Sequence, residues 1–153
     1  MDVNLVSQLC ITNGTTTMYV YTVAGGLSSV SLAYPAYTCI HSDGYIIFDQ
    51  NTQNTWGITS NTDATSIDTT ETGATNSNED KVIGLGRNSN RIFVFGEKTI
   101  EAFYVTTNFD FPYQKDRGAS FDIGCIARDT IGSINDQLFW LWIVTGNAKL
   151  VVT

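Results

Sequence analysis

The sequence predicts an all-β protein built from antiparallel, propeller-like blades, and three observations support this fold class. Apolar runs with a period of two recur along the chain, whereas amphipathic helical patterns do not. Thirteen glycines and only two prolines favour many tight turns. Apolar four-residue runs also begin at residues 45, 92 and 138, so they are 47 and then 46 residues apart. Repeats of about 40–50 residues, each with several antiparallel strands, are typical of propeller blades.

Residues 1–40 are expected to form an N-terminal β segment, as an irregular or partial blade. The run "TTMYVYTVA" (16–24) follows the turn dipeptide Asn13-Gly14 and alternates as a strand does. Its central "MYVY" begins only 27 residues before the run at residue 45, so the first module departs from the repeat.

Residues 41–153 are expected to hold the propeller-like modules. The core strands "YIIF" (45–48), "IFVF" (92–95) and "LFWL" (138–141) are preceded by the weaker strands "YTCIH", "VIGLG" and "TIGSI". They are followed by the strands "TWGIT", "TIEAFYV" and "KLVVT". Because about three modules do not close a propeller of four or more blades, this partial propeller is expected to belong to a larger β architecture or to be closed by another chain. A small antiparallel β-sandwich is the alternative.

The segment at residues 59–80, "TSNTDATSIDTTETGATNSNED", is expected to be a long polar loop. Apart from Ile67 it contains no large apolar residue, so it is too polar to build a core of its own. Two interpretations remain open for it: an arm that reaches a neighbouring subunit, and a loop that is only mobile.

The charge balance argues against extended nucleic-acid binding. The net charge is −7, from 8 basic and 15 acidic residues, and no two basic residues adjoin. A nucleic-acid groove needs clustered Lys and Arg, so only local phosphate contacts, for example from Arg87 and Arg91, are compatible with this sequence. The N-terminus lacks the pattern of a signal peptide, and no apolar run reaches the length of a membrane span.

The cysteines predict free, buried thiols and no metal site. Cys10, Cys39 and Cys125 are odd in number and widely spaced, which favours a reducing compartment during assembly. Cys39 and His41 would share one face of a strand, but two ligands do not make a zinc site and no second pair exists.

No catalytic or cofactor-binding residue is predicted. The chain's single histidine has no nucleophile motif around it, and Gly84-Leu85-Gly86 is interpreted as a close strand turn. Glu97 and Glu101 leave a glycoside hydrolase fragment as a less favoured alternative, because paired carboxylates can cleave sugars. The chain is therefore not expected to be an enzyme.

A carbohydrate-binding, receptor-attachment module is the other alternative. It depends on Trp56, Trp140 and Trp142, since tryptophan faces often bind sugars. Trp140 and Trp142 would share one strand face, and at least one of the two faces must belong to the core.

An ordered series of motifs from Asp43 onward resembles one known family. "DGYIIF" comes first, followed by "WGITS", "VFGEKTIEAFY", "DFPYQ", a glycine and an aromatic before "GC", and finally "FWL". This series is similar to the tail hub proteins of short-tailed bacteriophages, also called packaged-DNA stabilisation proteins or tail accessory factors. The resemblance covers about two-thirds of the chain, and the first forty residues share only β character with the family.

The resemblance implies a structural virion protein of the phage tail, assembled in the host cytoplasm. Six copies of a propeller-like subunit would form a homo-oligomeric, hexameric ring, a hub or nozzle that continues the DNA channel below the portal and adaptor. The ring would help to retain packaged DNA and would meet the tail needle and the tailspike proteins. The family brings no catalytic residues, no cofactor and no metal. An acidic chain suits a channel through which DNA passes without sequence-specific binding.

The stretch at 101–125, "EAFYVTTNFDFPYQKDRGASFDIGC", is predicted to join blades or subunits. Residues 100–105 are expected to form an outer strand, 108–118 a crossover to the next blade, and Asp116-Arg117-Gly118 its turn. The predicted interface residues are Phe109, Phe111, Pro112, Tyr113, Arg117 and Phe121.

Overall fold

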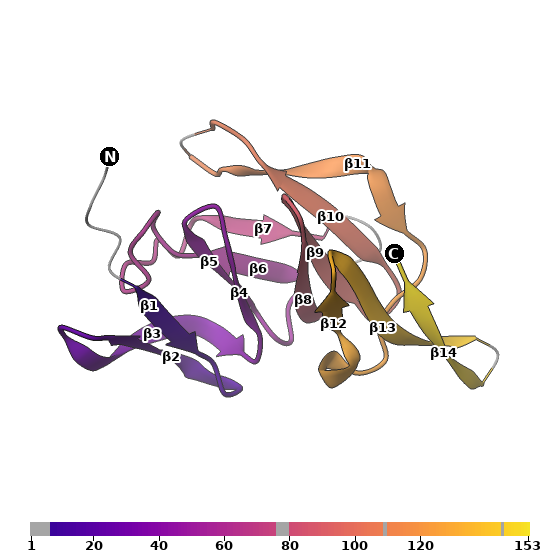
Figure 1. Cartoon of the computed structure of the whole chain (residues 1–153), viewed down its shortest axis with the longest axis horizontal. Helices are drawn as coiled ribbons and strands as arrows, with labels where there is room; N and C mark the ends of the chain where they lie inside the picture. The colour runs from indigo at the N-terminus through magenta and orange to yellow at the C-terminus, as the bar shows by residue number, and fades with distance from the viewer. Residues whose placement is uncertain (1–6, 76–79, 109, 145) are drawn as a thin grey trace.

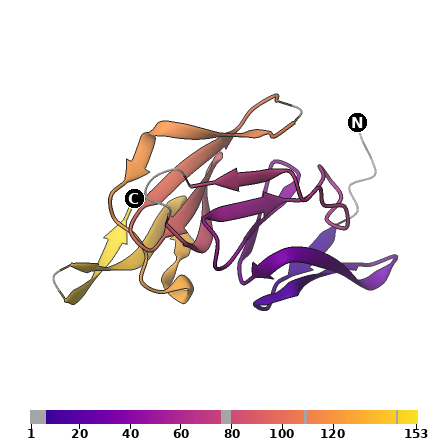
Figure 2. The same cartoon turned by 180° about the vertical axis from the view of Figure 1, so that it is seen from behind.

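The chain is all-β. The computed structural model describes residues 7–75, 80–108, 110–144 and 146–153. These residues form four antiparallel sheets, and in each sheet the strands follow one another in chain order. Figures 1 and 2 show the four sheets side by side, with the first and fourth at opposite ends of the row.

Each sheet is a simple meander of three or four strands. The first contains β1 (Gln8–Ile11), β2 (Thr15–Thr22) and β3 (Gly26–Ala36). The second contains β4 (Cys39–Ser42), β5 (Tyr45–Asp49), β6 (Thr55–Ile58) and β7 (Thr72–Ala74). The third contains β8 (Val82–Asn88), β9 (Arg91–Gly96), β10 (Ile100–Val105) and β11 (Tyr113–Phe121). The short 3₁₀ helix η1 (Arg128–Thr130) leads into the fourth, which contains β12 (Gly132–Ile134), β13 (Gln137–Val144) and β14 (Asn147–Val152).

The repeat that the sequence predicts corresponds to the second strand of each sheet. The runs at 45, 92 and 138 lie in β5, β9 and β13. The run in the expected N-terminal segment lies in β2, and the strands β1 to β3 within that segment form the first of four meanders. This meander includes β3, whose sequence "GLSSVSLAYPA" is rich in small polar residues.

Strand β9 shows why the sheets pack face to face. Its residues are buried on both sides, since Ile92 and Val94 pack toward the second sheet and Phe93 and Phe95 toward the fourth. Successive side chains of a strand point to opposite faces, so a continuous apolar run must be covered twice. The third sheet is therefore an interior layer.

The hydrophobic core consists of clusters that lie between neighbouring sheets. Met18, Val20 and Phe48 belong to the cluster between the first and second sheets. The cluster between the second and third sheets contains Ile47, Trp56, Ile58, Val82, Leu85, Ile92, Val94, Phe103 and Tyr113. The cluster between the third and fourth contains Phe93, Phe95, Ile100, Ala102, Cys125, Leu138 and Trp140. This arrangement, with the core between successive meanders, is that of propeller blades.

The first strand of each of the last three sheets lies where these sheets meet. Strand β8 contacts both β4 and β12. The Gly84-Leu85-Gly86 sequence lies within β8, so its interpretation as a turn is wrong. A Cβ at Gly84 would come within 2.8 Å of Cδ1 of Ile131, which shows that the glycine allows the fourth sheet to approach this backbone closely.

The predicted crossover at residues 108–118 is also wrong. Residues 113–121 form β11, which pairs with β10 as the outermost strand of the third sheet, so the expected outer strand 100–105 is its neighbour. The turn signal at Asp116-Arg117-Gly118 marks an irregularity within that strand. Lys115 pairs with Phe103 and Ser120 with Glu101, so that four residues of β11 bulge out opposite Ala102. Short polar residues and glycine favour such a departure from the ladder as readily as they favour a turn.

The polar segment 59–80 is only partly a loop. Its described residues include β7, in which Gly73 lies beneath the indole of Trp56; a Cβ there would be 2.2 Å from that ring. Ala64 is buried in the core cluster of the first and second sheets. The segment therefore supplies both an outer strand and one core contact.

Asp80 connects the start of the third sheet to the β9–β10 turn. Its Oδ2 atom accepts hydrogen bonds from the backbone N–H groups of Lys98 and Thr99, at 2.6 and 2.7 Å. The side chain is buried, and the Thr99 hydroxyl lies 3.3 Å from the same oxygen. One carboxylate thus satisfies several donors that no strand pairing reaches.

Replacing Asp80 should weaken the third sheet. Asp80→Ala leaves the buried amide of Thr99 and the half-buried amide of Lys98 without an acceptor, and we expect a loss of about 2–3 kcal/mol in the free energy of unfolding. Urea denaturation followed by tryptophan fluorescence measures this loss. Asp122→Ala, at an exposed aspartate after β11, is the control and should change stability by less than about 0.5 kcal/mol. Equal effects of the two substitutions would show that the Asp80 hydrogen bonds contribute nothing.

Candidate functional site

An aromatic cluster fills the contact between the second and third sheets. Trp56 of β6 lies at its centre, with ring centroids 5.1 Å from Phe103, 5.3 Å from Phe111 and 5.6 Å from Tyr113. Tyr45 packs edge-on against Tyr113 at 5.9 Å. Tilted and edge-to-face geometries are the preferred ones for aromatic pairs and add specificity to the area that they bury.

The β10–β11 connection positions two of these rings. Phe111 and the buried Pro112 precede β11, and the hydroxyl of Thr106 donates to the carbonyl oxygen of Pro112 at 3.0 Å. This bond closes the hairpin next to the point where Tyr113 enters the strand. The hairpin therefore holds Phe111 and Tyr113 against the second sheet.

Tyr113 also makes a polar contact across the two sheets. Its hydroxyl donates to the carbonyl oxygen of Ser42, at the end of β4, at 3.0 Å. Burial raises the pKa of Tyr113 well above its usual value, and the nearby Asp43 and Tyr45 add to the shift. The phenol thus stays protonated and keeps its donor role at any ordinary pH.

The predicted interface residues separate into two groups. Phe111, Pro112 and Tyr113 lie at the contact between sheets, whereas Arg117 and Phe121 lie on exposed positions of β11. Phe109 lies outside the described residues. The first group therefore makes a contact within the chain, whereas Arg117 and Phe121 are exposed on the outer strand of the third sheet.

Arg128, which sequence reasoning missed, makes a second connection between sheets. Its guanidinium lies 4.0 Å from the ring centroid of Tyr37, and its Nε donates to the carbonyl oxygen of Ile83 at 2.7 Å. It thereby joins the β3–β4 connection to β8 from its own position in η1. A lone arginine in a polar stretch carries no sequence signal of such a role.

The buried carboxylate of Asp49 lies beside this contact. It accepts hydrogen bonds from the backbone N–H groups of Tyr37 and Thr38, at 2.8 and 2.6 Å. Burial raises the pKa of Asp49, while these bonds and the charge of Arg128 oppose the rise. The carboxylate fixes the chain where it passes from the first sheet to the second.

The candidate catalytic carboxylates do not form a shared site. Glu101 is fully buried, and its Oε1 atom accepts from the ammonium group of Lys115 at 2.7 Å. Glu97 is exposed after the end of β9. A carboxylate enclosed in the sheet cannot reach a sugar, so the hydrolase alternative gains no support.

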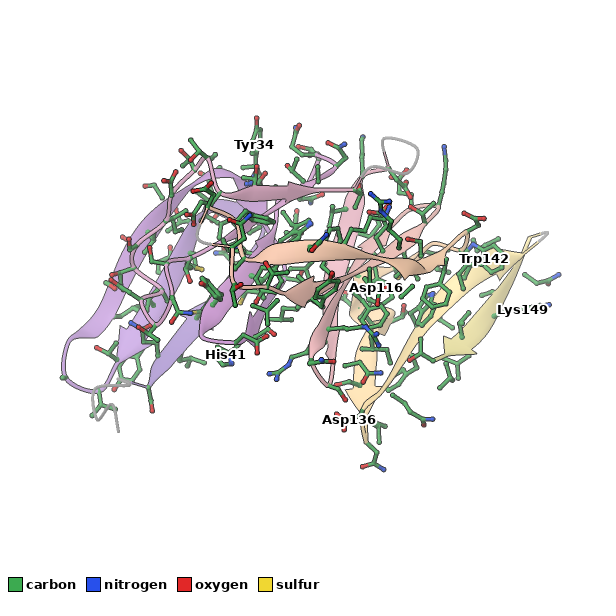
Figure 3. The ribbon with its side chains drawn as sticks, turned by 90° about the horizontal axis from the view of Figure 1, so that it is seen from above. Tyr34, His41, Asp116, Asp136, Trp142 and Lys149 are labelled. Atoms are coloured by element: carbon green, nitrogen blue, oxygen red, sulfur yellow. The ribbon has the colours of Figure 1, made fainter. Side chains whose placement is uncertain are left out.

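The tryptophans do not form the exposed cluster that a sugar-binding surface would need. Trp56 and Trp140 are buried, and Trp142 packs against the core cluster of the third and fourth sheets. In Figure 3, Trp142 lies closer to the third sheet than Lys149, its neighbour on β14, does.

The described residues include no group of three or more His, Cys, Asp or Glu side chains placed to hold a metal ion. No helix in the described part of the chain is long and apolar enough to cross a membrane.

Both end sheets present apolar side chains on their outward faces. On the first sheet, Leu9 pairs with Tyr21 and Tyr21 with Leu27, and these side chains are exposed. On the fourth sheet, the ladder places Phe139 beside Val152 and Leu141 beside Leu150. Leu27 and Leu150 are 63% and 64% exposed, so these faces differ from the buried faces of the interior sheets.

Antiparallel meanders packed face to face, with the core between successive sheets, define a β-propeller-type fold. The comparison with known families agrees. A family model described as "Bacteriophage P22 Gp10, beta-propeller" (Phage_stabilise) matches residues 1–151, and the chain belongs to this family of phage structural proteins that stabilise packaged DNA. No match was found among curated proteins.

The family match extends further than the motif series indicates. It includes the first forty residues, in which the sequence shares only β character with the family. The first meander explains the difference, since its strands repeat the architecture of the later sheets without repeating their motifs.

The hydroxyl of Tyr113 should contribute to stability through its bond to Ser42. Tyr113→Phe keeps the ring packing but removes one hydrogen bond to the carbonyl oxygen of Ser42, so we expect a loss of about 1 kcal/mol in the free energy of unfolding. Tyr104→Phe is the matched control, because the Tyr104 hydroxyl bonds to Gln114 at the exposed surface, and should change stability by less than about 0.5 kcal/mol. Chemical denaturation of both variants measures the difference. A Tyr113→Phe variant as stable as the unsubstituted protein would contradict the role of this bond.

Proposed function

We propose that this protein is a component of the phage tail hub or nozzle, where it continues the DNA channel below the portal and adaptor and helps to retain packaged DNA. Membership of the family gives the structural role in the virion. The position in the tail and the channel role are the proposal.

The observation that carries this proposal is the pair of outward apolar faces on the first and fourth sheets. Each contact between neighbouring sheets within the chain is made by two apolar faces of the same kind. Exposed apolar patches of this sort mark surfaces for assembly. We infer that neighbouring copies of the chain cover them, as the subunits of a closed ring would.

The charge distribution favours a channel over a DNA clamp. The chain carries a net charge of −7. Arg91, one of the two candidate phosphate contacts, pairs with Asp116 at 3.0 Å, and Arg87 donates to the carbonyl oxygen of His41 at 3.1 Å. Both guanidinium groups thus have partners within the third and second sheets. An acidic channel wall would let DNA move through without binding it.

The proposed assembly is a homo-oligomer, a hexameric ring, that meets the portal and adaptor proteins, the tail needle and the tailspikes. Arg117 and Phe121 are the candidate contacts of the outer edge, because β11 is an edge strand with unpaired backbone groups along one side. Phe109 precedes this strand in the chain and is retained as a candidate from the sequence.

Labelling of purified virions tests the position in the tail. An antibody against this chain, followed by electron microscopy, should mark the tail at the vertex that carries the portal. Particles lacking the protein should lose packaged DNA faster than complete particles, measured as nuclease-sensitive DNA. Label found only on the capsid shell would contradict the proposal.

A charge on the fourth sheet's outward face should block assembly. Leu150→Asp places a carboxylate on the face that we assign to a neighbouring copy, and burying that charge without a partner is costly. We expect loss of the oligomer in light scattering at concentrations where the unsubstituted protein assembles, with the same β circular dichroism. Asn90→Asp is the control, because Asn90 is exposed in the β8–β9 turn of the third sheet, which is neither of the end sheets. An oligomer unaffected by Leu150→Asp would exclude this face as the contact.

A further inference from the structure

Cys10 and Cys39 bring two thiols together at the junction of the first and second sheets. Cys10 lies on β1 and Cys39 on β4, and both pack against the core cluster that joins these sheets. The Sγ atom of Cys39 lies 3.7 Å from the carbonyl oxygen of Cys10. The sulfur of one residue therefore lies directly against the other residue.

Both thiols are also accessible from solvent. They are half-buried, and they line one open surface cavity of about 380 Å³ together with Thr12, Tyr37 and other residues. Cys125 provides the contrast, because it is buried in the core between the third and fourth sheets. A small oxidant can thus reach the first two cysteines but not the third.

The surroundings keep the two thiols protonated at neutral pH. Burial raises the pKa of Cys10 to about 11, and the neighbouring Cys39 adds to the rise. Burial also raises the pKa of Cys39, although hydrogen bonds with Thr12 partly offset it. Since the thiolate is the reactive form, the pair reacts slowly and stays reduced in a cytoplasm that maintains free thiols.

We propose that Cys10 and Cys39 are a dithiol pair that closes to a disulfide between the first and second sheets when the protein meets a low-molecular-weight disulfide such as oxidised glutathione. This inference stands independently of the tail position proposed above.

The reaction proceeds by two thiol–disulfide exchanges. The thiolate of one cysteine attacks a sulfur of oxidised glutathione, which forms a mixed disulfide and releases one glutathione thiolate. The second cysteine's thiolate attacks the protein-bound sulfur and releases the other glutathione. The protein loses two protons and two electrons, and one oxidised glutathione becomes two reduced molecules.

The bond would add a covalent connection to the polar contacts between the first two sheets. Polar connections between the first two sheets include the bond from the amide of Ala64 to Oε1 of Gln8, at 2.9 Å, and that from the amide of Asn51 to the carbonyl oxygen of Pro35, at 2.8 Å. A disulfide adds a covalent link and restricts the unfolded chain between the two cysteines.

Incubation of the purified, reduced full chain with oxidised glutathione tests the proposal. We expect an intact mass lower by two hydrogen atoms and a peptide map in which Cys10 is joined to Cys39 and Cys125 is free. The oxidised protein should melt about 5–10 °C higher than the reduced protein, and dithiothreitol should reverse the shift.

Single substitutions identify the reacting residues. Cys10→Ser and Cys39→Ser should each abolish the loss of two hydrogen atoms, whereas Cys125→Ser should leave it unchanged. The peptide map of the unsubstituted protein needs no variant to fold, so it decides the outcome if a variant does not. A map showing no Cys10–Cys39 link, a bond through Cys125, or only stable glutathione adducts would overturn the proposal.

Discussion

The burial of both faces of the third sheet is the constraint on which the rest of the structure depends. β9 is apolar at every position from Ile92 to Phe95, so it needs a sheet on either side. The second sheet covers one face and the fourth covers the other. The second and fourth sheets each have another face, which points away from the third sheet. The first sheet packs on that face of the second sheet, so the sheets form a row.

Polar contacts then fix how neighbouring sheets are positioned on one another. The apolar faces supply most of the attraction, but they do not specify the exact alignment. Buried or half-buried polar groups do so: Asp49 at the passage from the first sheet to the second, the Tyr113 hydroxyl on Ser42, and Arg128 against Ile83. Each joins a side chain to the backbone of another element, and a shift of one sheet would leave a buried polar group unpaired.

The same packing rule connects the fold to the role of the family. The family is one of phage structural proteins that stabilise packaged DNA. The described residues bury Trp56, Trp140 and Glu101 within the packed sheets and leave exposed apolar side chains at both ends of the row. Contacts between sheets thus bury most of the core side chains, and the faces at the two ends of the row are left uncovered.

The sequence by itself determined the fold class and the strands at the centre of the sheets, because a strand buried on both faces must be apolar throughout and repeats visibly. It also indicated that Phe111 and Tyr113 belong to a packing contact. Tertiary structure decided the outer strands β3, β7 and β11, whose polar and glycine-rich sequences pair only because a neighbouring strand offers its free edge. It also decided the partners of Arg128 and the approach of Cys39 to Cys10, since residues distant in the chain meet only when the sheets pack.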